Sequence, residues 1–134
     1  NVEDRLGHGR FLLLYLGSGV AAAVSQILMS PQSSIPMVGA SGAIAGILGA
    51  YLLFFPGAKI VTLIPLFFFT QTVELPAVVF LGFWFLIQWV QGITTIGQMA
   101  DLEMGGVAFW AHIGGFLSGM FGVALLRPHR RVGW

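Results

Sequence analysis

The sequence predicts an all-α protein, a polytopic bundle of transmembrane helices. Of its 134 residues, 57% are hydrophobic and only 8% are charged, whereas a soluble domain carries roughly 25% charged residues. Four apolar segments are each near the length that crosses a bilayer, about 20 residues. Stretches rich in proline, glycine or polar residues separate these segments, as is typical of the loops between spans.

Composition also excludes several classes of function. Six basic residues nearly balance five acidic ones, so the chain lacks the positive footprint of a nucleic-acid-binding protein and we expect no nucleic-acid partner. There is no cysteine, which excludes disulfides, thiolate catalysis and zinc–thiolate sites.

The first predicted span covers about residues 11–29, a run without a charged residue. Before it, residues 1–10 are polar, and we expect a solvated loop or the start of a helix. After it, residues 30–36 read SPQSSIP, and their prolines and serines favour a turn-rich loop.

The second predicted span covers about residues 41–55, where Pro56 and Gly57 end it. It is short, at about 15 residues or roughly 22 Å, against a bilayer core of about 30 Å. If its Phe55 end reaches one interface, Ser41 lies roughly 8 Å below the other.

The next segment, residues 60–69, is apolar but too short to cross and contains Pro65. We expect it to lie at the interface or to pack under the bundle. The third span is then about residues 77–96, rich in Phe and Trp, and the fourth is about residues 107–126.

Four spans place both chain ends on one side of the membrane. All six basic residues then fall on that side. The loops on the opposite side contain no basic residue and two acidic ones, Asp101 and Glu103. The positive-inside rule makes the basic side cytoplasmic. We therefore expect residues 1–134 to form one membrane domain with both ends in the cytoplasm.

One serine and one histidine fall at the same depth in this topology. The second and fourth spans run in the same direction, and His112 lies five residues after Val107, about 7.5 Å below the outer interface. That depth matches the estimate for Ser41. The two spans also carry small residues at the spacing that lets helices touch in lipid, namely Gly42, Gly46, Gly115 and Gly119.

A serine–histidine pair has a definite chemistry. A serine hydroxyl is a poor nucleophile until a base removes its proton. Histidine can remove that proton and later donate it to the leaving amine. Unpaired N–H groups at a helix N-terminus stabilise the oxyanion, so we expect support from the backbone at Gly39, Ala40 and Gly42. Two alternatives stay open, in which Ser41 is a helix cap or packing residue, or the pair lines a pore.

Other polar or aromatic residues receive weaker interpretations. We read His8 and His129 as solvated and Asp101 and Glu103 as loop residues. We assign no role to Glu74 or Gln88. The aromatic residues of the third span are expected to face lipid or to pack, with a substrate gate at Trp84 as the alternative.

Three motifs in order resemble the rhomboid intramembrane serine proteases. Gly39-Ala40-Ser41-Gly42 is similar to the family's GxSG motif, and residues 111–119, AHIGGFLSG, to its AHxxGxxxG motif. Residues 3–7, EDRLG, resemble the ExxxG segment that follows the family's second core helix.

The resemblance implies a Ser41–His112 catalytic dyad that cleaves transmembrane segments of membrane proteins near the outer leaflet. It implies no metal and no cofactor. The bilayer and transmembrane protein substrates are the expected partners. The compact loops favour a bacterial plasma membrane.

The chain departs from the family pattern in two respects. It supplies four spans of a six-helix core, so we expect an N-terminally truncated fragment whose missing helices carry the family's remaining oxyanion donors. At the position four after Ser41, where the family often has an aromatic that stacks on the histidine, this chain has Ala45.

Two rival functions remain. One is a non-catalytic relative that binds membrane clients, against which the retention of both Ser41 and His112 argues. The other is a channel or transporter fragment, for which we would expect polar residues spread through the depth of the membrane rather than gathered at its outer end.

Overall fold

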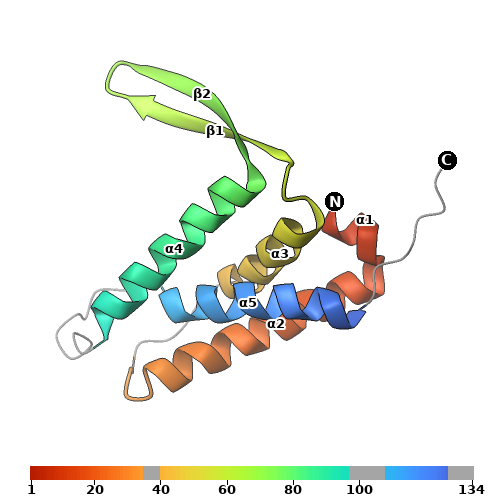
Figure 1. The fold of residues 1–134 in the computed structure, drawn as a ribbon. Helices are drawn as coiled ribbons and strands as arrows, with labels where there is room; N and C mark the ends of the chain where they lie inside the picture. The colour runs from red at the N-terminus through yellow and green to blue at the C-terminus, as the bar shows by residue number, and fades with distance from the viewer. Residues whose placement is uncertain (35–39, 97–107, 127–134) are drawn as a thin grey trace.

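The computed structural model describes residues 1–34, 40–96 and 108–126. Helices pack into a bundle from which one β-hairpin extends (Figure 1). The elements in chain order are α1 (Val2–Leu6), α2 (His8–Met29), α3 (Ser41–Phe54), β1 (Lys59–Leu66), β2 (Phe69–Pro76), α4 (Ala77–Thr95) and α5 (Phe109–Leu126).

The helices follow the predicted spans closely. Helices α2, α4 and α5 are long and apolar enough to cross a membrane, and α3 is a shorter apolar helix. The predicted polytopic bundle is therefore confirmed. Several residues of the sequence interpretation lie outside the described part of the chain: Gly39, Asp101, Glu103, Val107 and His129.

Small residues bring α3 and α5 together until their backbones touch. A Cβ added to Gly115 would overlap the carbonyl of Gly42, and one added to Gly119 would overlap the carbonyl of Gly46. Both contacts pair residues four apart on each helix in the same chain direction, so the two helices run parallel. In lipid such close approach stabilises a helix pair by van der Waals contact.

Helix α2 packs against the same pair through its own small residues. Gly46 faces the buried Ser18, Gly42 faces Ala22, and Gly114 faces Ser25. Helices α2, α3 and α5 therefore form one closely packed unit, with α4 on the far side of α5 from α2 (Figure 1).

The N-terminal segment is a short helix rather than a solvated loop. Val2 and Leu6 of α1 are buried in the core cluster that also contains Ala50 of α3. Gly7 joins α1 to α2 with φ 80°, a conformation that side chains with a Cβ rarely adopt. Residues 1–10 are mostly polar, but the burial of Val2 and Leu6 packs this segment against one end of the bundle.

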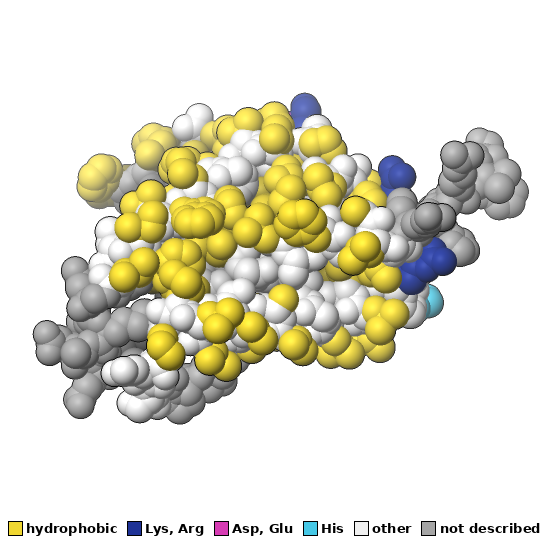
Figure 2. Space-filling view, turned by 60° about the horizontal axis from the view of Figure 1, so that its bottom comes forward, with side chains coloured by type: hydrophobic (Ala, Val, Ile, Leu, Met, Phe, Trp, Pro, Cys, Tyr) yellow, Lys and Arg dark blue, Asp and Glu magenta, His cyan; other side chains and the backbone are white. Residues whose placement is uncertain are grey.

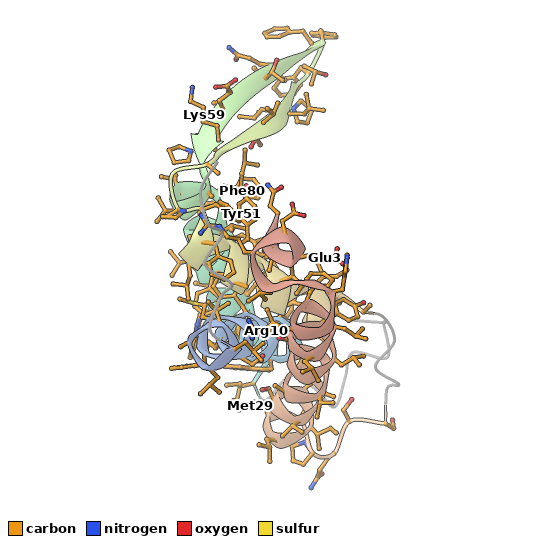
Figure 3. All side chains as sticks on the ribbon, turned by 90° about the vertical axis from the view of Figure 1, so that its right-hand side faces the viewer. Glu3, Arg10, Met29, Tyr51, Lys59 and Phe80 are labelled. Carbon is orange, nitrogen blue, oxygen red and sulfur yellow. The ribbon has the colours of Figure 1, made fainter. Side chains whose placement is uncertain are left out.

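The apolar segment after α3 is one strand of an antiparallel hairpin. Strand β1 pairs with β2 from Lys59 opposite Pro76 to Leu66 opposite Phe69, and the hairpin leaves the helices at its Lys59 end (Figure 3). Most of its side chains are exposed, and Phe67 and Phe68 at the tip are fully so. Of the two expectations for this segment, packing under the bundle is wrong, because strand pairing satisfies its backbone without help from the helices. A position at the membrane interface stays a prediction.

Helix α4 contacts the bundle through large side chains. Phe85 stacks on Phe116 of α5 at 4.7 Å between ring centroids, and Trp89 meets Trp110 edge to face at 5.7 Å. Tyr51 of α3 and Phe80 near the start of α4, both labelled in Figure 3, pack against a second core cluster that includes Leu81 and Phe116.

The outer surface suits a lipid environment. In Figure 2 hydrophobic side chains are spread over the whole face shown, and its few Lys and Arg side chains lie toward the upper and right-hand edges. The exposed hydrophobic residues include Leu13, Val20 and Leu28 of α2 and Phe83 of α4. Such an extended apolar surface is unusual for a soluble monomer.

Candidate active site

The structure brings Ser41 and His112 into direct contact. The Ser41 Oγ lies 3.0 Å from the Nε2 of His112, which is hydrogen-bonding distance. The two residues are 71 positions apart in the chain, so the contact depends on the fold. Ser41 is exposed and His112 is half-buried, which leaves the hydroxyl accessible to a substrate.

Both residues owe their positions to the first turns of parallel helices. Ser41 is the first residue of α3, and His112 is the fourth of α5. One turn further along, Gly115 contacts the Gly42 backbone, and a second turn brings Gly119 against Gly46. A side chain at Gly115 or Gly119 would separate α5 from α3, and one at Gly42 or Gly46 would overlap Ala22 or Ser18 of α2. The absence of these side chains therefore sets the distance between the hydroxyl and the imidazole.

The backbone around Ser41 is arranged as a helix N-terminus. The first intrahelical bond of α3 runs from the Ile44 N–H to the Ala40 carbonyl at 2.9 Å. The preceding N–H groups, those of Ser41, Gly42 and Ala43, lie ahead of that bond, at the positive end of the helix dipole. Ala40 and Gly42 flank Ser41 in the chain, and Gly39 lies outside the described residues.

A residue without an assigned role in the sequence completes the surroundings of the imidazole. The Oε1 of Gln88, on α4, lies 2.7 Å from the Nδ1 of His112. The Gln88 side chain is almost fully buried, at 6% exposure. The signal that points to such a residue is its chemistry, because an amide within an apolar span needs a hydrogen-bond partner.

Helix α4 supplies a second neighbour of the imidazole, an aromatic ring. The Trp84 ring lies 5.8 Å from the His112 ring between centroids, and 5.9 Å from that of Phe116. Ala45, the position at which the resemblance implies an aromatic, is buried and small. The aromatic neighbour of the imidazole is thus supplied by α4 in place of α3, and Trp84 packs on the site.

Helix α2 fixes the start of α5 through another glutamine. The Oε1 of Gln26 accepts a hydrogen bond from the Ala111 N–H at 3.2 Å. This N–H belongs to the first turn of α5, where intrahelical acceptors are lacking. The residue directly before His112 is therefore held by α2, and His112 itself by α4.

Two other pairs of titratable side chains in the described part of the chain lie away from this site. His8 bonds to Glu3 at 2.5 Å on the surface of α1 and α2, and Lys59 pairs with Glu74 at 2.9 Å at the base of the hairpin. Within residues 1–34, 40–96 and 108–126, no group of three or more His, Cys, Asp or Glu side chains gathers where a metal ion would bind.

Comparison with known proteins gives a match over almost the whole chain. The sequence model of the Rhomboid domain matches residues 1–129. A stretch of 51 residues is 49% identical to "Rhomboid protease GluP" of Bacillus subtilis (strain 168), covering 38% of this chain and 10% of that protein. It is 45% identical over 51 residues to "Putative rhomboid protease YdcA" of the same organism, covering 38% of this chain and 25% of the relative.

These alignments span only a small part of either relative. No solved structure matches the chain. The family match and the site geometry together supply the basis for a functional interpretation.

Proposed function

The chain belongs to the rhomboid family, and from this premise we propose that it is an intramembrane serine endopeptidase in which Ser41 and His112 form the catalytic dyad. At the family level, both the domain match and the names of the relatives support an intramembrane protease. The observation that carries the finer proposal is the 3.0 Å contact between Ser41 Oγ and His112 Nε2.

The reaction is peptide hydrolysis through an acyl-enzyme. Ser41 Oγ attacks the carbonyl carbon of the scissile bond while its proton passes to His112 Nε2. The carbon–nitrogen bond then breaks, and Nε2 returns the proton to the leaving amine. Water attacks the acyl-enzyme with His112 again as the base, and Ser41 leaves with its proton restored.

The oxyanion of each tetrahedral intermediate needs donors. The N–H of Ser41 and those beside it at the start of α3 are the donors we assign, because they precede the first intrahelical bond and carry the positive end of the dipole. The resemblance implies further donors on helices outside residues 1–134, so the experiments below use the natural full-length protein.

The substrates we propose are transmembrane segments of other membrane proteins, cut near the outer leaflet. Ser41 and His112 both lie in the first turn of their helices, at the ends opposite to those near Arg5 and Lys59. Under the positive-inside rule the basic end faces the cytoplasm, which sets the dyad toward the outer side of what we propose is a bacterial plasma membrane.

Cleavage in a defined bilayer tests the proposal. Full-length protein is reconstituted into proteoliposomes with a single-span substrate, and the products are identified by mass spectrometry. We expect cleavage by the wild type, and rates lower by at least about 10³-fold for Ser41→Ala and His112→Ala. Ser118→Ala is the matched control, because its hydroxyl bonds to the Gly115 carbonyl on α5 away from the dyad, and it should cleave at the wild-type rate.

Two outcomes would contradict the proposal. Cleavage by Ser41→Ala at the wild-type rate would exclude Ser41 as the nucleophile. Substrate that binds wild-type protein and Ser41→Ala equally, and is cut by neither, would favour the non-catalytic client-binding function instead.

A further inference from the structure

Gln88 occupies a specific place relative to the dyad. Its Oε1 lies 2.7 Å from His112 Nδ1, on the opposite side of the imidazole from Ser41, whose Oγ is 3.0 Å from Nε2. The three side chains come from α4, α5 and α3 in that order. They form a continuous line in which His112 bonds at both ring nitrogens.

With Gln88 Oε1 as the atom beside Nδ1, a neutral imidazole has one consistent arrangement of protons. An amide oxygen accepts hydrogen bonds and donates none, so Nδ1 must carry the proton that Gln88 Oε1 accepts. In a neutral imidazole Nε2 then has a free lone pair. That lone pair faces the Ser41 hydroxyl, which is the arrangement that a general base requires.

The surroundings hold Gln88 in that arrangement. Its side chain is 6% exposed, and in an apolar environment an amide without a partner costs several kcal/mol. Trp84, one helical turn before Gln88 on α4, packs beside the same imidazole, with ring centroids 5.8 Å apart and the ring planes tilted by 35°. Helix α4 thus restrains both the tilt of the ring and the nitrogen that carries its proton.

We propose that Gln88 is a positioning residue that holds His112 in the Nδ1–H tautomer, with Nε2 aimed at Ser41. The inference rests on the proposed function, in which Nε2 is the base. Throughout the reaction Nδ1–H stays bonded to Gln88, which gains and loses no proton. The only protons that move are those that pass through Nε2, from Ser41 to the leaving amine and later from water back to Ser41.

Substitution at Gln88 separates positioning from folding. Gln88→Leu removes the acceptor, and Gln88→Met keeps the length of the side chain without a strong acceptor. Gln88→Glu keeps an acceptor oxygen at the same position. Gln91→Leu is the matched control, because Gln91 is an exposed glutamine on the same helix.

Kinetics in proteoliposomes give the first readout. We expect Gln88→Leu and Gln88→Met to lower kcat by about 10- to 100-fold, by analogy with partners that orient metal-bound imidazoles, with KM within about twofold of the wild type. Gln88→Glu should recover most of that loss, and Gln91→Leu should match the wild type. A purely structural role predicts equal losses in all three Gln88 variants, together with lower thermal stability.

Nitrogen NMR of histidine-labelled protein gives a second readout that does not depend on activity. The His112 signal is assigned by its loss in His112→Ala. We expect a protonated Nδ1 and an unprotonated Nε2 in the wild type, in Gln88→Glu and in Gln91→Leu. A shift toward the Nε2–H tautomer is expected in Gln88→Leu and Gln88→Met.

The failures of the two proposals are distinguishable. If the wild type cleaves no faster than Ser41→Ala, the proposed function fails and the role of Gln88 falls with it. If the wild type cleaves but Gln88→Leu and Gln88→Met keep its kcat or its tautomer, only the role of Gln88 is overturned.

Discussion

Helix α5 is held on one face by backbone contacts and on the other by aromatic rings. Toward α3, Gly115 and Gly119 lie directly on the carbonyls of Gly42 and Gly46. Toward α4, Phe116 and Trp110 meet the rings of Phe85 and Trp89 at 4.7 and 5.7 Å. His112 stands between the two faces, with Ser41 on one side and Gln88 on the other.

The two faces differ in how far they can adjust. Backbone carbonyls have no rotamers, so the glycine face tolerates no added atom without moving a helix. Aromatic side chains on α4 can tilt and repack at smaller cost. The glycine face therefore fixes the distance between Ser41 and His112. The aromatic face, which can adjust, influences the orientation of the imidazole.

The largest effect is expected at the rigid face. Gly119→Ala places a methyl group against the Gly46 carbonyl, and we expect a destabilisation of about 3 kcal/mol, at the upper end of the usual overpacking range. The measurement is SDS-induced unfolding in mixed micelles. Gly82→Ala on α4 is the control, because a Cβ there meets nothing within 4 Å, and the greater helix propensity of alanine should leave its stability unchanged or raise it by up to about 1 kcal/mol. A destabilisation of Gly82→Ala equal to that of Gly119→Ala would contradict the backbone contact as the cause of the loss.

A smaller effect is expected when a ring of the aromatic face is replaced. Phe85→Leu keeps an apolar side chain but loses the stacked contact with Phe116. We expect a loss of about 1 kcal/mol, the usual range for an aromatic pair, in the same unfolding assay. A loss as large as that of Gly119→Ala would mean that α4 is held as rigidly as α3.

The smallest effect is expected where a glycine meets a ring instead of a backbone. A Cβ added to Gly92 would come within 3.1 Å of the Trp110 ring, which can move by a few tenths of an ångström. The greater helix propensity of alanine offsets part of that cost, so Gly92→Ala should change the stability by less than about 1 kcal/mol. A value near that of Gly119→Ala would show that Trp110 cannot yield.

The comparison also explains which features the sequence predicted. The span limits follow from local signals such as Pro56-Gly57 and the uncharged run of residues 11–29. The approach of Ser41 to His112 followed from helix rise, bilayer thickness and the glycine spacing, because backbone-to-backbone packing leaves few alternatives. These predictions depend on short-range patterns and on a topology with few choices.

The missed features depend on side chains that meet from distant parts of the chain. The sequence assigned no role to Gln88 and did not single out Gln26, because their partners on α5 are apparent only in the fold. Residues 60–69 show no alternation of polar and apolar residues that would distinguish a strand from a short buried segment, and Pro65 argues against a strand. Only the pairing partner after Phe68 makes the hairpin apparent.

The central claim is that contact with His112 makes Ser41 a nucleophile. The most direct measurement is reaction of the full-length protein with a fluorophosphonate, followed by peptide mass spectrometry to locate the adduct. The account predicts a phosphonylated Ser41 in the wild type and in Ser118→Ala, and no adduct in Ser41→Ala or His112→Ala. An adduct on Ser41 that forms at the wild-type rate in His112→Ala, or one that forms on a different residue, would contradict it.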